Sequence, residues 1–139
     1  MNRFATGLAV VMAVALAGAS TAQAATYKGE IKGEPEASLT LIVKEIEGDR
    51  YVTRVEFKKI PVDCDGGNST TGGDASAGGP GEPGIEIKGG EFSGPWNYGK
   101  LSGKVRGGGK IAGTISIKTD AGGSLGECKS GKLNYVVRD

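Results

Sequence analysis

The feature that most limits what this chain can fold into is an alternation of apolar and polar residues. In residues 50–60, RYVTRVEFKKI, one set of side chains (Tyr51, Thr53, Val55, Phe57) alternates with another (Val52, Arg54, Glu56, Lys58). A strand points successive side chains to opposite faces, so the pattern predicts a strand with one buried and one wet side. Helical spacing of apolar residues is sustained nowhere after residue 24, and glycines interrupt every long stretch.

Two hairpins can be predicted. Residues 39–43 place Leu39, Leu41 and Val43 on one face, and Gly48-Asp49 supplies a turn into residues 51–57. The second hairpin follows from a duplication, in which GKLSGKV (99–105) recurs as GKIAGTI (109–115).

Pairing of the two copies about Gly108 sets three pairs opposite one another: Val105 with Ile111, Gly103 with Gly113, and Leu101 with Ile115. Glycine readily adopts the positive φ that the connecting loop requires. The paired glycines fall on the apolar face, so a bulky side chain, Trp96 or Phe92, is expected against them.

Further strand patterns lie near residues 26–32, at 85–87 and at 133–138. Short strands separated by turn residues predict an all-β fold. We expect a seven- to eight-stranded antiparallel β-sandwich, with a small closed β-barrel as the alternative.

Residues 1–24 have the features of a signal peptide. They contain one charge, Arg3, an apolar run over residues 8–17, and the small-residue pattern of Ala22 and Ala24. A retained membrane anchor is the alternative, but the run is shorter than the roughly 18 residues that span a bilayer. We therefore expect cleavage after Ala24, secretion to the extracellular space or the cell envelope, no membrane insertion of the cleaved chain, and one domain over residues 25–139.

Cys64 and Cys128 are the only cysteines, and in an exported chain they predict one disulfide. Residues 65–84 follow the first cysteine and contain nothing apolar larger than alanine, apart from Pro80 and Pro83. Such a composition predicts a glycine-rich flexible loop within a single domain.

Residues 25–139 contain 16 Lys and Arg against 16 Asp and Glu, a net charge of zero. Binding to nucleic acid requires clustered excess cations. The lysines are distributed through glycine-rich turns and strand faces, so we expect them to be solvated and expect no nucleic-acid partner.

The chain has no histidine, which removes Ser-His-Asp and Cys-His catalysis and all histidine metal sites. A calcium site is a weak alternative, because Asp63, Asp65 and Asp74 fit positions 1, 3 and 12 of an EF-hand loop. Gly67 and Asn68 occupy positions where that loop needs a ligand and a glycine. We therefore favour a solvated loop and expect no metal and no cofactor.

Three aromatic residues, Phe92, Trp96 and Tyr98, lie within seven residues of one another. Exposed and coplanar, Trp96 and Tyr98 would form a platform for sugar rings, with Asn97 bonding to hydroxyl groups. In a chain with 6% aromatic residues the core needs these rings, so burial of Trp96 is favoured.

Paired carboxylates could hydrolyse glycosides, although no spacing singles out a pair. The candidates are Glu30, Glu34, Glu36, Glu45, Glu47, Glu56, Glu86 and Glu91.

A resemblance to known proteins rests on the signal peptide and on three segments: KIPVDCDGG, GKVRGGGKIAGTI and the terminal CKSGKLNYVVRD. The chain resembles small secreted bacterial, actinobacterial-type all-β domains with a single disulfide and no assigned activity. That resemblance implies no catalytic or binding residue.

Taken together, the sequence favours a secreted, non-enzymatic binding or interaction protein at or outside the cell surface, whose partner is a polysaccharide or a cell-surface protein. A carbohydrate-binding module using Trp96 and Tyr98 is the first alternative and a small hydrolase is the second. An interaction protein would have buried aromatics and a partner surface made by loops or an unpaired strand edge.

Overall fold

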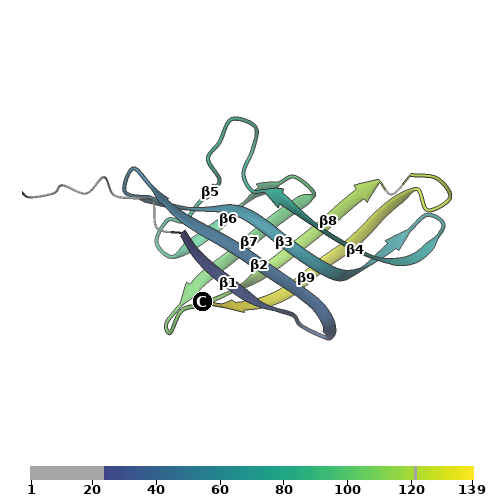
Figure 1. Ribbon diagram of the computed structural model, residues 1–139, viewed down its shortest axis with the longest axis horizontal. Helices are drawn as coiled ribbons and strands as arrows, with labels where there is room; N and C mark the ends of the chain where they lie inside the picture. Colours follow the sequence, from purple (N-terminus) through teal and green to yellow (C-terminus); the bar gives the residue numbers. More distant parts are fainter. Residues whose placement is uncertain (1–23, 121) are drawn as a thin grey trace, which may run out of the picture.

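The structure, a computed structural model, describes residues 24–120 and 122–139 and consists of antiparallel strands (Figure 1). The predicted signal peptide lies outside the described residues except for Ala24, the first residue of β1. No helix that could cross a membrane occurs in this part of the chain. The strands are β1 (Ala24–Ile31), β2 (Glu34–Ile46), β3 (Asp49–Cys64), β4 (Gly67–Ser76), β5 (Ile85–Glu86), β6 (Glu91–Trp96), β7 (Gly99–Arg106), β8 (Lys110–Asp120) and β9 (Glu127–Arg138).

One continuous sheet has the order β4-β3-β2-β1-β9-β8-β7-β6, with β5 paired to β3. The far end of β3 also pairs with β9, which closes β3, β2, β1 and β9 into a small barrel. The two edges of the sheet meet at a second seam, where Ala77 bridges Trp96 and the Gly78 N–H donates to the Pro95 carbonyl at 2.9 Å. The all-β prediction is confirmed, and of the two architectures the pairing is that of the closed barrel.

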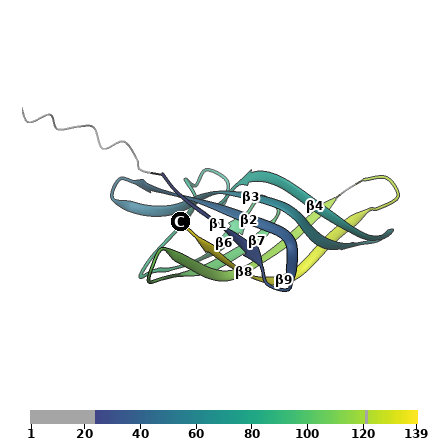
Figure 2. The same cartoon turned by 60° about the horizontal axis from the view of Figure 1, so that its bottom comes forward.

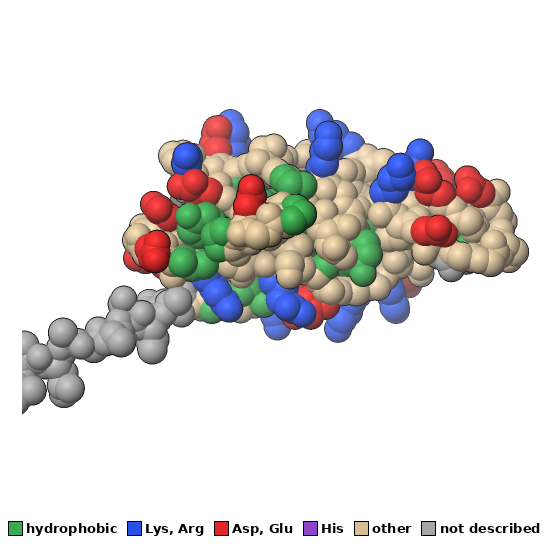
Figure 3. All heavy atoms as spheres, turned by 90° about the horizontal axis from the view of Figure 1, so that it is seen from above, with side chains coloured by type: hydrophobic (Ala, Val, Ile, Leu, Met, Phe, Trp, Pro, Cys, Tyr) green, Lys and Arg blue, Asp and Glu red, His purple; other side chains and the backbone are tan. Residues whose placement is uncertain are grey.

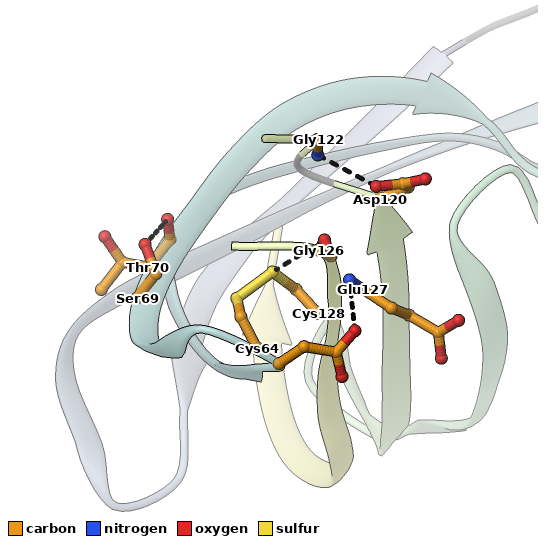
Figure 4. The surroundings of a disulfide bond; sticks show 9 residues. Cys64, Ser69, Thr70, Asp120, Gly122, Gly126, Glu127 and Cys128 are labelled. Carbon is orange, nitrogen blue, oxygen red and sulfur yellow. Dashed lines mark hydrogen bonds between the residues drawn. A yellow bond between two sulfur atoms is a disulfide. The ribbon is translucent and has the colours of Figure 1, made fainter. Parts of the chain in front are cut away.

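The disulfide prediction is also confirmed, because Cys64 at the end of β3 lies directly opposite Cys128 in β9 and is bonded to it (Figure 4). Next to it, the Asp65 N–H donates to the Glu127 carbonyl at 3.0 Å, and the Glu127 N–H donates to the Asp65 carboxylate at 3.0 Å. The disulfide therefore fastens a short contact between strands that are distant in the sequence.

Both predicted hairpins are present. In the first, Leu39 lies opposite Phe57 and Leu41 opposite Val55. Its turn is centred one residue earlier than expected, on Glu47 and Gly48, whose φ values are 53° and 86°. Two consecutive residues of positive φ are typical of the type I′ turn, whose twist matches that of the strands.

The prediction of a flexible loop over residues 65–84 is wrong for its first half, because Gly67–Ser76 forms β4 and pairs with β3. An edge strand needs only backbone hydrogen bonds to its neighbour, and within β4 only Ala75 is buried. Small residues also make room here, since a Cβ on Gly73 would lie 3.3 Å from the Phe57 ring. The absence of large apolar residues therefore concealed a strand.

In the second hairpin all three predicted pairs are confirmed, including Gly103 opposite Gly113. Phe92 in β6 lies opposite Gly103, and Tyr135 in β9 lies opposite Gly113. A Cβ on Gly103 would lie 2.5 Å from Phe92 Cζ and 2.7 Å from the Tyr135 hydroxyl. Phe92, one of the two expected aromatics, therefore covers the glycines together with Tyr135, and the four residues form one row inside the barrel.

Gly103→Ala should destabilise the protein by about 1–3 kcal/mol, because the new methyl group overpacks the space between two buried rings. Gly107→Ala is the matched control, since a Cβ there meets nothing within 4 Å and its φ is not positive. Urea unfolding measures both variants. Equal stability of the two would contradict the packing of Phe92 and Tyr135 over Gly103.

The double variant Cys64→Ser/Cys128→Ser should lose up to roughly 4 kcal/mol of unfolding free energy, because the disulfide closes a loop with a sequence separation of 64 residues. Urea unfolding of the oxidised protein and the variant measures the difference, and the variant should be indifferent to reductant. A variant as stable as the parent would show that the β3–β9 contact holds without the bond.

Candidate functional site

The aromatic residues at the end of β6 do not form a sugar platform. Trp96 is 4% exposed, Tyr98 is half-buried and Asn97 is exposed. The Trp96 and Tyr98 rings are perpendicular, at 81°, with centroids 5.5 Å apart. A platform needs coplanar, accessible rings, so the carbohydrate-binding alternative that used these residues is wrong in its geometry, and the favoured burial of Trp96 is confirmed.

Trp96 instead seals the second seam of the barrel. Its ring packs edge-on against Phe57 of β3, with centroids 5.3 Å apart, and Tyr98 packs on both rings. Its indole N–H donates to the Ser116 carbonyl at 3.3 Å. A buried indole with a satisfied N–H contributes to stability, which explains why this residue lies where β4 and β6 meet.

The three carboxylates of the calcium alternative are not brought together. Asp74 forms an ion pair with Arg54, with 2.5 Å between Asp74 Oδ1 and Arg54 Nε. Asp65 accepts the Glu127 N–H, and Asp63 lies opposite Asn68 near the β3–β4 turn. In the described part of the chain, no three acidic or cysteine side chains are grouped in a way that could hold a metal.

The glutamates considered for hydrolysis all lie at the surface, and among the described residues no charged side chain is buried. Glu86 and Glu91 line one groove, but Glu86 pairs with Lys88 at 3.4 Å and Glu91 with Lys104 at 3.0 Å. A general acid usually needs apolar surroundings that keep it protonated. This arrangement therefore singles out no acid and base.

The same groove carries a row of polar side chains across its strands. It has a volume of about 890 Å³ and lies on the outer side of β6–β9, strands that run side by side in Figure 2. Four polar residues on successive strands cross it in register: Ser93, Ser102, Thr114 and Asn134. We call it the polar groove; Lys32 and Lys104 also line it.

Hydrogen bonds hold the centre of the polar groove in one arrangement. The Ser102 and Thr114 hydroxyls lie 2.7 Å apart, and the Tyr135 hydroxyl donates to the Ser102 carbonyl at 2.8 Å from the inner side. Burial raises the pKa of Tyr135, so this phenol stays protonated and keeps donating across the ordinary pH range. The groove is therefore a rigid polar surface.

These residues were not predicted from the sequence, although part of their pattern is local. Ser102 and Thr114 occupy outward positions of the predicted hairpin, and Asn134 alternates with buried Tyr135. Placing Asn134 beside Thr114 also requires the β8–β9 register, which shifts at a bulge between Ile117 and Lys118. No local pattern predicts that shift.

No family model, no curated protein and no solved structure matches the chain. The resemblance to small secreted bacterial β-domains therefore stays a prediction.

Fluorescence of Trp96, the only tryptophan, should be blue-shifted and protected from iodide, because the indole is buried. Trp96→Ala should lower the unfolding free energy by about 3–5 kcal/mol, the usual cost of emptying a large aromatic site. Tyr98→Ala, which removes a half-buried ring, should cost less in the same urea experiment. Red-shifted, readily quenched emission would place Trp96 at the surface instead.

Proposed function

We propose that this protein is an exported, non-enzymatic binding protein that holds a polysaccharide in the polar groove, at or outside the cell surface. The observation that carries the proposal is the row of Ser93, Ser102, Thr114 and Asn134, aligned across four paired strands. Hydroxyl and amide groups both donate and accept hydrogen bonds, as sugar hydroxyl groups do. A row spanning three strand spacings, about 14 Å, suits an extended chain better than a small compact ligand.

The interior supports placing the ligand outside the barrel. Most of the described buried side chains form one apolar cluster, which includes Ala77 and Trp96 at the second seam and Phe92 and Tyr135 beside the paired glycines. Rigid strands also hold binding groups more accurately than loops do. The burial of Trp96 further favours a binding surface that does not use the β6 aromatics.

An exported location is supported by the disulfide. Disulfides persist in oxidising compartments and are rare where thiols are kept reduced. The apolar run at residues 8–17, followed by Ala22 and Ala24, is the second support, because that pattern is typical of a cleaved leader.

A panel of immobilised neutral and acidic polysaccharides tests the proposal, and at least one should bind saturably without being cleaved. The double variant Ser102→Ala/Thr114→Val should weaken that binding about tenfold, because it removes two hydrogen-bonding groups that also satisfy each other. Thr70→Val, on exposed β4, is the matched control and should bind like the parent. Absence of saturable binding, release of cleaved sugar, or equal effects of both changes would contradict the proposal.

A further inference from the structure

Two parts of the chain carry opposite net charge, and the fold places them in different parts of the sheet. Residues 33–91 contain six Lys and Arg against twelve Asp and Glu, a net charge of −6. Residues 24–32 with 92–139 contain ten against four, a net charge of +6. The second set forms β1, β7, β8 and β9, which are neighbours in the sheet. The lysines are exposed or half-buried, as expected, but the positive charges outnumber the negative ones on these neighbouring strands, although the net charge is zero.

Within the second, positively charged set, which we call the positive half, four cationic residues lie directly opposite one another on adjacent strands. Lys28 of β1 pairs with Arg138 of β9, Arg138 with Lys110 of β8, and Lys110 with Arg106 of β7. Lys28, Arg106 and Arg138 are exposed and Lys110 is half-buried. We call these four residues the cationic row.

The cationic row is costly to the folded state. Like charges directly opposite on neighbouring strands repel each other. None of the four side chains forms an ion pair with an acidic side chain of the described residues. Thr40 of β2 lies opposite Lys28 and separates it from Glu56 of β3. Glu30 lies two residues after Lys28 in the same strand, β1. Asp139 follows Arg138, and its carboxylate lies at Gly109, but no ion pair to the row offsets the repulsion. Such an arrangement suggests a role in binding.

The cationic row meets the polar groove at one end. Arg106 belongs to the row and also lines the groove, together with Lys104 and Lys32. Figure 3 shows another face of the molecule, where acidic side chains gather at the two ends and basic ones along the long margins. An anion in the groove would meet Arg106, Lys104 and Lys32, while the groove's two acids, Glu86 and Glu91, are paired with lysines.

We propose that the ligand of the polar groove is a linear anionic polysaccharide, part of which lies along the neighbouring cationic row. This inference rests on the proposed function and names the ligand class. Neighbouring strands are about 4.7–4.9 Å apart. That spacing is comparable to the length of one sugar ring in an extended chain, so a chain that crosses the strands can bring one acidic group to each cation of the row.

A glycan fits this face better than a nucleic acid. Single-stranded nucleic acids are held by exposed aromatic side chains on which bases stack. Phe92 and Tyr135, the aromatic residues that line the polar groove, are 5% and 1% exposed and pack on the inner side of the strands. The outer groups are hydroxyls, an amide and cations, which suit sugar rings bearing carboxylate or sulfate.

The test is titration of the protein with polygalacturonate, dextran sulfate, neutral dextran and single-stranded DNA by calorimetry. One or both acidic glycans should bind, with affinity falling at least tenfold from about 50 mM to about 300 mM NaCl because counterions compete. The two acidic glycans distinguish a carboxylate from a sulfate ligand. Neutral dextran should not bind, and DNA should bind more weakly than the preferred glycan.

The double variant Lys28→Gln/Lys110→Gln should weaken glycan binding about tenfold. The same variant should also raise the urea concentration at the unfolding midpoint, because it removes repulsion on both sides of Arg138. If the two lysines only stabilised the fold, replacing them would lower that midpoint. Lys44→Gln/Lys58→Gln, in the negative half, is the matched control and should change binding less than twofold.

Three outcomes would overturn this inference: tighter binding of DNA, equal binding of neutral dextran, or equal effects of the two lysine pairs. If neutral dextran binds and Ser102→Ala/Thr114→Val weakens that binding, the anionic ligand class is wrong but the proposed function stands. Failure of every glycan to bind saturably would contradict both.

Discussion

The contact between the end of β3 and the start of β9 is the constraint on which the rest of the structure depends. Only two residue pairs join these strands, and one of them is the Cys64–Cys128 disulfide. That contact closes a ring of four strands and commits the remaining sheet to curl until β4 meets β6. Trp96 is buried because it lies at this second meeting, so a residue suited to binding sugar serves the core instead.

Closure at two seams also determines where a ligand can be held. The interior is occupied by apolar side chains, and the glycine pair Gly103 and Gly113 lets Phe92 and Tyr135 lie directly on the backbone. The same strands carry Ser102 and Thr114 on their outer side, at alternate positions. Packing inside and polar display outside are therefore two consequences of one alternating pattern.

Local patterns predicted much of the fold and little of the site. Alternation and turn residues were enough to pair Leu101 with Ile115, because a hairpin depends on short-range geometry. The disulfide was predicted because the chain has two cysteines. β4 was missed because an edge strand needs no apolar residues. The cationic row was missed because Lys28 and Arg138 meet only through a strand pairing between opposite ends of the chain. The net charge of the chain, which is zero over residues 25–139, does not reveal that these cations are grouped.

The most direct test is residue-resolved amide hydrogen exchange of the oxidised protein with and without the acidic glycan that binds best. Binding on the outer face of a closed barrel predicts added protection in β7, β8, β9 and β1, while the amides of Asp65 and Gly66 at the first seam stay unchanged. Added protection confined to β2–β4, or at the seams, would contradict this picture. It would place the ligand on the acidic half or inside the sheet.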